Sequence, residues 1–170
     1  KTAKGKMATS YSYDETTLQL KKSTATDGVE VTYEYNPEGQ LAKVTDATGT
    51  REFAYDLRGQ VVKESVTLLT GPDTPPIRYE IRRSYTPLGQ PESVHLISVA
   101  DESLSLDHKV AYAWNTHGQI SGVTSLAGEF TYEYDPTNPT LLTKMTGPAH
   151  TVETTYEPHR NLITSVTNRA

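Results

Sequence analysis

Five histidines are the side chains in this sequence best suited to hold a metal ion or to move a proton near neutral pH. They are His95, His108, His117, His150 and His159. No two of them have the i, i+2 or i, i+4 spacing that would place two ligands on the same side of a strand or helix. The sequence therefore predicts no metal site.

Ser105, Asp107 and His108 are the residue types of a hydrolytic triad. Asp107 and His108 are adjacent, however, and adjacent residues of a strand point to opposite faces, so they cannot converge on one substrate atom. The chain also has no cysteine, which excludes thiol nucleophiles, disulfides and cysteine-ligated metals. We predict that the protein is not an enzyme, with no catalytic residues and no cofactor.

Several aspartates stand at the start of short polar segments, namely Asp27, Asp46, Asp56 and Asp135. None belongs to the Asp-x-Asp-x-Asp loop that binds calcium. A phosphate-binding glycine loop would have to lead into a helix, and the sequence offers no helix start. We expect these aspartates to form turns, because their side chains accept hydrogen bonds from backbone N–H groups a few residues on.

Length and charge limit the class of protein. The chain has 170 residues, enough for one domain with its own core. It has 16 basic and 21 acidic residues and a net charge of −5, whereas a nucleic-acid-binding protein needs a basic surface. No apolar run is long enough to span a membrane. Because the first residue is Lys1 and not a methionine, we expect residues 1–170 to be a segment of a larger chain.

The most informative feature is an internal repeat. An aromatic anchor recurs every 20 to 30 residues and is followed by a polar turn. In four copies Gly-Gln stands four and five residues after the anchor. The anchors are Tyr13, Tyr35, Tyr55, Tyr85, Trp114, Tyr134 and Tyr156, and the glycines are Gly39, Gly59, Gly89 and Gly118.

The residue types after each anchor are those of a type I turn. Asn36, Asp56, Asn115 and Asp135 are suited to the first turn position, proline is frequent at the second, and glycine accepts a positive φ at the fourth. In the last copy, Asn161 is the residue expected to take the left-handed conformation. A second set of turns, containing Gly28, Gly49, Gly128 and Gly147, lies between these corners.

Aromatic residues keep a period of two back from the anchors, and all fourteen of them fit this pattern. The pattern places them on one face of a β-sheet, with Thr, Glu and Arg on the other. The sequence predicts an all-β chain of about a dozen antiparallel strands. Aromatics at strictly alternating positions are typical of the buried side of a sheet, although exposed tyrosines could also stack against sugars.

The stretches "YEYNPEGQLAKVTDATG" (33–49) and "FAYDLRGQVVKES" (53–65) resemble YD repeats, also called RHS (rearrangement hot spot) repeats. The resemblance extends over roughly 9–169. It implies antiparallel β-hairpins in a spiralling sheet that is part of a hollow shell or barrel, as in bacterial Tc toxin cocoons, RHS polymorphic toxins and teneurins. The aspartyl self-cleavage motif of the family is missing, because no Asp follows Tyr156, so no protease residues are carried over.

The leading hypothesis is that residues 1–170 are one repeat region that forms part of a shell encasing or displaying another domain. Its expected partners are the remainder of the same large protein or neighbouring RHS repeats, with no nucleic acid. Its expected location is the surface or exterior of a bacterium. With both edge strands unprotected, the isolated chain is expected to associate.

Two long hairpins suggest an alternative. Residues 61–85 and 93–114 each predict two long strands about a polar tip. They could supply extra strand length to a shell. They could instead make the chain an adhesion module that binds carbohydrate or protein through 66–78 and 97–108.

Overall fold

The computed structural model describes residues 8–99 and 107–170, and every helix or strand within these residues is a β-strand. The fourteen strands are β1 Thr9–Tyr13, β2 Leu20–Ala25, β3 Glu30–Tyr35, β4 Leu41–Asp46, β5 Gly49–Tyr55, β6 Val61–Leu68, β7 Ile77–Tyr85, β8 Pro91–Ser98, β9 Asp107–Trp114, β10 Ile120–Ser125, β11 Gly128–Tyr134, β12 Leu142–Thr146, β13 Thr151–Tyr156 and β14 Ile163–Arg169. The all-β prediction is confirmed. The fourteen strands of the described residues, two for each of the seven repeats, agree with the prediction of about a dozen.

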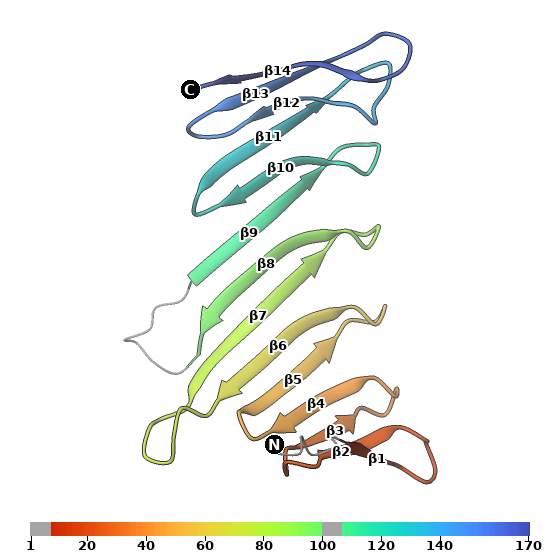
Figure 1. The fold of residues 1–170 in the computed structure, drawn as a ribbon, viewed down its shortest axis with the longest axis vertical. Helices are drawn as coiled ribbons and strands as arrows, with labels where there is room; N and C mark the ends of the chain where they lie inside the picture. The colour runs from red at the N-terminus through yellow and green to blue at the C-terminus, as the bar shows by residue number, and fades with distance from the viewer. Residues whose placement is uncertain (1–7, 100–106) are drawn as a thin grey trace, which may run out of the picture. The chain divides into compact units, whose positions relative to one another are not determined.

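The strands lie side by side in the order in which they follow one another in the chain, with β1 and β14 at the two ends of that order (Figure 1). The pairings within β1–β7 and within β9–β14 are antiparallel throughout. Such a meander needs only short connections, and the repeated turns supply them.

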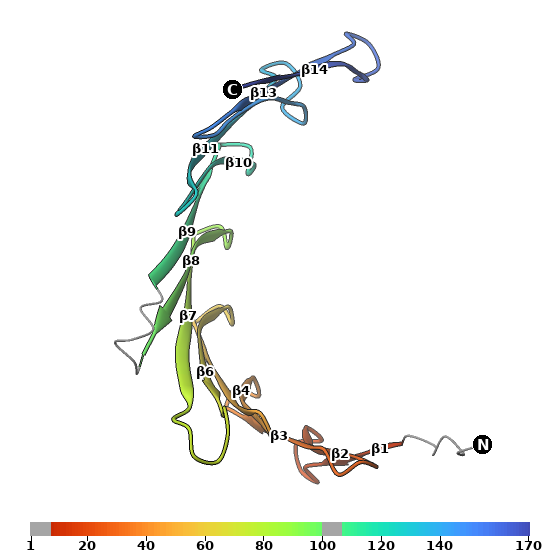
Figure 2. The same cartoon turned by 60° about the vertical axis from the view of Figure 1, so that its left-hand side comes forward.

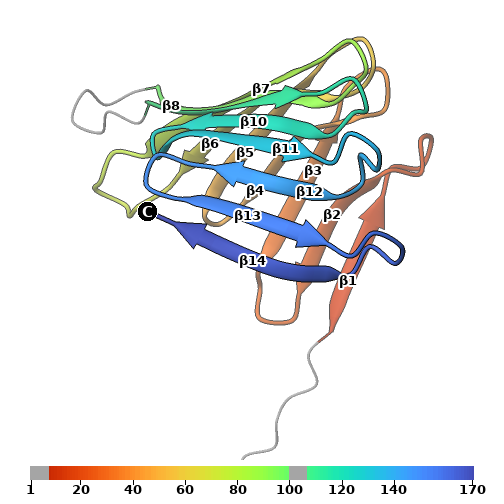
Figure 3. The same ribbon diagram turned by 90° about the horizontal axis from the view of Figure 1, so that it is seen from above.

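The described residues fall into two compact units. The first comprises residues 8–82, 96–99 and 107, and the second comprises 83–95 and 108–170. In the second unit, the corners after β9, β11 and β13 lie at the same ends of the strands (Figure 2). Strands β10–β14 follow one another across this unit, with β14 outermost (Figure 3).

In the first unit, the register places the aromatic residues on one face. Residues directly opposite each other on antiparallel strands share a face. One such row crosses β3 to β7 and consists of Tyr33, Val44, Arg51, Val66 and Tyr79. Phe53 and Tyr55 follow Arg51 at even spacing and so lie on the same face. We call it the aromatic face.

The second unit repeats this arrangement. Tyr112 is opposite Val123, which is opposite Phe130. Tyr132, two residues later, is opposite Met145. The other face of both units carries Lys, Glu and Thr side chains, and we call it the charged face. The aromatic rings thus share one face within each unit, as predicted, but in the first unit that face also carries Arg51, and Glu64 opposite Phe53.

The sheet has little interior. Among the described residues Val66 is the one fully buried hydrophobic side chain, 2% exposed. The aromatic rings of β3–β13 are half-buried, and those of Tyr11 and Tyr13 are 59% and 57% exposed. The expectation that the aromatic face is a buried one therefore holds only in part. The described strands form one sheet, so no second layer of described residues covers the rings.

Backbones approach closely where β5 begins. Gly49 has φ +142° and is opposite Leu68 of β6. A Cβ atom at Gly49 would lie 1.9 Å from the carbonyl oxygen of Thr67. The position therefore excludes every residue but glycine, which sets the length of the turn between β4 and β5.

Candidate functional site

The corner after β3 shows how the repeated residues act. The N–H of Gly39 donates to the carbonyl of Asn36, and the N–H of Asn36 donates to the carbonyl of Gln40. The Asn36 side chain accepts from the N–H of Gln40 at 2.8 Å and donates to the Gln40 side chain at 2.9 Å. Gly39 has φ +82°. Side chain and backbone thus close the same turn, as predicted for a type I corner.

The other corners keep this geometry. The Asp56 carboxylate accepts from the N–H groups of Arg58 and Gln60, and the Asn115 side chain accepts from those of His117 and Gln119. Gly59, Gly89 and Gly118 have φ values of +79°, +83° and +76°. The turn roles predicted for these residues are confirmed, and so is the positive φ of Asn161, at +57°.

Each anchor is the last residue of its strand, and most anchors fall at a shift in register. The shift occurs at Tyr13, Tyr35, Tyr55, Trp114, Tyr134 and Tyr156. Tyr85 ends β7. A bulge at this place increases the local twist and fixes the start of the turn.

Some anchors also reach back to the preceding corner. The hydroxyl of Tyr55 donates to the carbonyl of Leu41 at 2.7 Å. The hydroxyls of Tyr134 and Tyr156 donate to the carbonyls of Ile120 and Leu142, both at 2.8 Å. The indole N–H of Trp114 donates to the carbonyl of Pro91 at 2.7 Å. In each case the acceptor is the first residue of the strand that leaves the preceding corner.

The recurrent glutamine makes a second link, in the other direction. The side-chain amide of Gln19 donates to the carbonyl of Gly39 at 3.0 Å, and that of Gln90 donates to the carbonyl of Gly118 at 3.2 Å. Gln119 donates in the same way to the carbonyl of Pro139. A Cβ atom on Gly39 or Gly118 would lie 3.3 Å from the glutamine nitrogen, so glycine also leaves room for this amide.

We call the two kinds of link together the corner ladder. The sequence predicts the shared face of the anchor rings and the positive φ of the glycines, but not that both the anchor and the glutamine join successive corners. The sequence does hold a signal, since glutamine follows the corner glycine in all four copies that have one. It could not be interpreted without knowing that successive corners lie next to one another.

The ladder varies at the ends of the described strands. In the first corner Leu18 takes the left-handed conformation, φ +58°, where four other corners have glycine. The hydroxyl of Tyr35 has no hydrogen-bond partner among the described residues, and Gln19 alone joins these two corners. In the last two corners a leucine replaces the glutamine. The N–H groups of Asp135 and Glu157 donate to the carbonyls of Leu141 and Leu162, as the N–H of Asn36 donates to that of Gln40.

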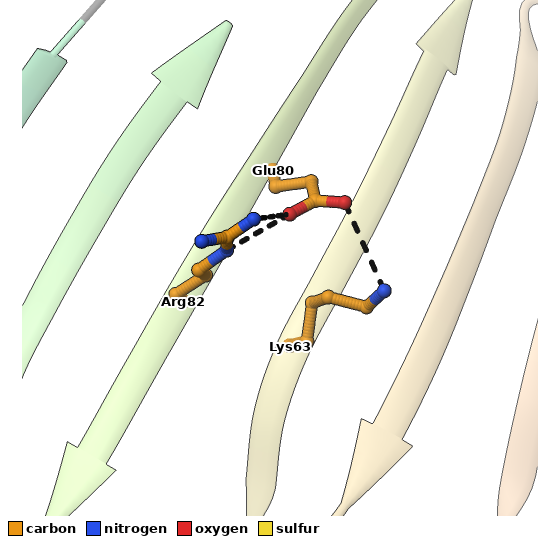
Figure 4. Close-up of polar contacts among 3 residues, drawn as sticks. All are labelled: Lys63, Glu80 and Arg82. Carbon is orange, nitrogen blue, oxygen red and sulfur yellow. Dashed lines mark hydrogen bonds and ion pairs between the residues drawn. The ribbon is translucent and has the colours of Figure 1, made fainter. Parts of the chain in front are cut away.

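The charged face carries cross-strand ion pairs. Lys22–Glu30, Lys43–Glu52 and Lys144–Glu133 have N–O distances of 2.7, 3.5 and 3.4 Å. The densest cluster lies between β6 and β7, where Glu80 contacts Arg82 at 2.8 Å and Lys63 at 3.7 Å (Figure 4). The Glu80 side chain is only 13% exposed. Pairs of this kind favour one register of the strands over its neighbours.

Hydrogen bonds lower the pKa of two of the aspartates at turns. The hydroxyl and the N–H of Thr48 lower the pKa of Asp46. The hydroxyl of Thr137, with the N–H groups of Asn138 and Thr137, lowers the pKa of Asp135. The predicted role of these two residues in turns is confirmed, because their carboxylates accept hydrogen bonds within the turn.

The residues considered for chemistry are not brought together. No group of three His, Asp or Glu side chains within residues 8–99 and 107–170 could hold a metal ion. Asp107 and His108 begin β9 as neighbours, and Ser105 lies outside the described residues. No helix in the described part of the chain could cross a membrane.

The two long hairpins form in part as predicted. The tip between β6 and β7 is held by the Thr70 hydroxyl, which lies 2.9 Å from the Thr74 hydroxyl and 3.1 Å from the Pro75 carbonyl. Leu69 beside it is 58% exposed. The hairpin 97–108 has the predicted strands β8 and β9, but its tip lies outside the described residues.

Comparison with known families agrees with the resemblance read from the sequence. The family pattern named RHS Repeat matches residues 13–51 and 35–75. The matched segments contain the first three corners, with Gly39 and Gly59, and further corners closed by a backbone hydrogen bond from their first to their last residue continue to residue 162. No curated protein matches the sequence. Residues 13–75 therefore match RHS repeats, and proteins with such repeats are of a shell-forming type that is generally extracellular or surface-associated.

Proposed function

We propose that this chain is part of the wall of an RHS shell that encases or displays another domain of a secreted or surface-exposed bacterial protein. In this proposal the aromatic face is the inner one. The role is structural, with neither catalytic residues nor a cofactor. The remainder of the shell and the enclosed domain are its partners.

One observation carries the proposal, namely that the aromatic face is half-exposed. A sheet is stable in water when its apolar face packs against another layer. Here the described residues contain no such layer, and Val66 alone is fully buried. A wall that closes around an interior, or around a second domain, would remove this face from bulk water and would gain about 25 cal/mol per Å² of apolar surface.

A pair of adjacent residues allows a sharp test. Arg51 is on the aromatic face, Glu52 is on the charged face, and both are exposed. Because the chain has no cysteine, Arg51→Cys and Glu52→Cys each introduce the one thiol in these residues. Both variants would be made in the full-length protein that contains these repeats, and labelled with a maleimide coupled to a large polyethylene glycol.

We expect the Glu52→Cys thiol to be labelled rapidly and the Arg51→Cys thiol to be protected at least tenfold. After denaturation both should react at the same rate. Equal labelling of the two native variants would reject an inner aromatic face. Protection of Glu52→Cys alone would reverse the orientation of the wall.

A second candidate is adhesion through the long hairpins. It is favoured by the β6–β7 tip, which is ordered by the Thr70 bonds and presents Leu69 to solvent. Replacing residues 70–75 by Asn-Gly should abolish binding to a protein receptor or cell surface. Binding to a glycan array that is lost in Tyr33→Ala or Tyr132→Ala would point to sugar stacking on the aromatic face.

A further inference from the structure

One pocket of the first unit combines apolar walls with a positive charge. It lies on β4, β5 and β6, which are neighbours in the sheet (Figure 1), and has a volume of about 200 Å³. Sites for free small molecules usually measure about 300–1,000 Å³, so this pocket suits a single side chain better. Its lining residues on the aromatic face include Val44, Asp46, Arg51, Phe53 and Leu68. We call it the Arg51 pocket.

The guanidinium of Arg51 has no counter-charge in this pocket. Arg51 is opposite Val44 on one side and Val66 on the other. It makes no ion pair with another described residue. Asp46 lines the same pocket, but its carboxylate accepts hydrogen bonds from the hydroxyl and the N–H of Thr48.

An unpaired arginine is tolerated on a surface in water, but it is costly on a face that is closed off from water. Burial of a charge is unfavourable unless an opposite charge and hydrogen bonds compensate for the lost hydration. On the charged face, Lys43 and Arg82 have the glutamates Glu52 and Glu80 as partners. The aromatic face, which the proposed wall turns inward, carries Arg51 without such a partner.

We propose that the Arg51 pocket binds an aspartate or glutamate side chain of the domain that the wall encloses. The guanidinium is planar and offers several N–H donors, two of which match the two oxygens of a carboxylate. Apolar side chains beside that acidic residue would lie against Val44, Phe53 and Leu68. The inference rests on the proposed wall function and names what its inner face holds.

The composition of the pocket favours a carboxylate over other anions. A carboxylate carries one negative charge, which Arg51 balances. A phosphate group would bring nearly two charges beside Asp46, which is itself an acid. A free inorganic anion would also leave the apolar part of the pocket empty, whereas a peptide segment can fill it.

Zero-length cross-linking tests the contact. A carbodiimide joins an amine to a carboxylate only where the two touch, so Arg51→Lys is introduced into the full-length protein that contains these repeats. Mass spectrometry should then find the new lysine joined to an aspartate or glutamate outside residues 1–170. Arg82→Lys is the matched control and should be joined to Glu80, its partner on the charged face (Figure 4).

Two results would overturn the proposal while the Arg82→Lys control reacts. The first is a cross-link from position 51 to Asp46 or to Glu64 alone, which would mean that the wall neutralises Arg51 by itself. Glu64 is the acid opposite Phe53 on the same face. The second is the absence of any cross-link from position 51.

Charge reversal tests whether the contact holds the enclosed segment. In Arg51→Glu, hydrogen exchange of the cross-linked segment should rise at least about tenfold, because a closed-off ion pair becomes a repulsion. Replacing the identified acid by lysine in the same protein should restore protection. Ala54→Glu, on the charged face of the same strand, should leave the segment unchanged. Equal exchange in Arg51→Glu and Ala54→Glu would reject the contact.

This inference and the wall function can fail separately. If Arg51→Cys is protected from labelling and Glu52→Cys is not, but no acid outside residues 1–170 is joined to position 51, the inner face stands and the Arg51 pocket is rejected. Equal labelling of the two thiols rejects the inner face. A cross-link to an outside acid that forms in spite of equal labelling would keep the acidic partner and reject its enclosure.

Discussion

At the scale of single residues, the fold depends on backbone conformations that few side chains tolerate. Four corners place glycine at φ near +80°, where a Cβ atom is strained. The first corner uses Leu18 in the same role, and the last uses Asn161. Asparagine tolerates the left-handed region better than leucine does. The first corner is therefore the place where the local sequence and the turn conflict.

Substitution of Leu18 by glycine should stabilise the chain. The side chain is 75% exposed, so little packing is lost, while left-handed strain of about 1–2 kcal/mol is removed. After the greater entropy of unfolded glycine is subtracted, we expect a gain of about 0.5–1 kcal/mol in the free energy of unfolding. Urea denaturation followed by circular dichroism measures it. Leu57→Gly, at an exposed corner position with negative φ, should destabilise by a similar amount, and the same sign in both variants would contradict the explanation.

Gly49→Ala should be severely destabilising. The new methyl would overlap the Thr67 carbonyl oxygen, so β5 and β6 must separate at this point, at a cost of about 3 kcal/mol or more. Gly28→Ala is the control. It has positive φ at +86° but no atom within 4 Å of the added Cβ, so it should lose only about 1 kcal/mol. Equal losses in the two variants, measured by urea denaturation, would show that the close approach at Gly49 is not tight.

Acid should destabilise the turns. Hydrogen bonds from Thr48 lower the pKa of Asp46 below its ordinary value of 3.8 in the folded chain. A lowered folded-state pKa means that the carboxylate stabilises the fold above pH 3.8 and that this contribution is lost as pH falls through the folded-state value. The urea midpoint should therefore be constant from pH 7 to pH 5 and fall below pH 3.8. Asp46→Asn should reduce this fall, and the same fall in the variant as in the wild type would contradict the explanation.

At the scale of elements, the hairpin is the repeating element, and the corner ladder joins one hairpin to the next. Each link is a single neutral hydrogen bond, worth about 1 kcal/mol. Its position matters more than its strength, because it joins corners that are 20 or more residues apart in sequence. The ladder thus holds successive hairpins in the same register.

The ladder predicts a difference between two tyrosines of the same strand. The hydroxyl of Tyr134 donates to Ile120, whereas the hydroxyl of Tyr132 has no hydrogen-bond partner among the described residues. Tyr134→Phe should lower the free energy of unfolding by about 1–2 kcal/mol, because the Ile120 carbonyl loses its donor. Tyr132→Phe should change it by less than about 0.5 kcal/mol. Urea denaturation of both variants measures the contrast, and equal effects would remove the ladder as a source of stability.

The elements could be predicted from sequence where the signal is local. The period of two around Tyr33 and Phe53, and the turn residues Asn36 to Gly39, determine strands and corners within a few positions. The contacts of Gln19 and Tyr55 could not be predicted, because they connect residues that are distant in sequence and become neighbours only when the hairpins pair. Leu18 was missed since leucine carries no turn signal. The half-exposed state of the rings depends on what lies beyond the sheet.

At the scale of the whole molecule, stability comes from contacts between neighbouring strands and not from a shared core. Val66 is the one fully buried apolar side chain among the described residues, and the strand order follows the chain. In such an arrangement each strand depends on the strands beside it.

Val66→Ala should therefore have a local effect. Loss of two buried methyl groups should destabilise the first unit by about 1–3 kcal/mol. Hydrogen exchange should increase in β5, β6 and β7, and β11 to β14 in the second unit should keep wild-type protection. Thr67→Ala, the neighbouring residue of β6 on the other face, is the control and should leave exchange near wild type. Uniform loss of protection across all fourteen strands would indicate one cooperative core.

The chain-ordered meander has a consequence for biogenesis. Every pairing is made with the strand synthesised just before, so no segment waits for a distant partner. The strands can therefore pair one after another, in chain order, during translation. Because strands pair in chain order, insertion or deletion of one hairpin would leave the remaining pairings as they were.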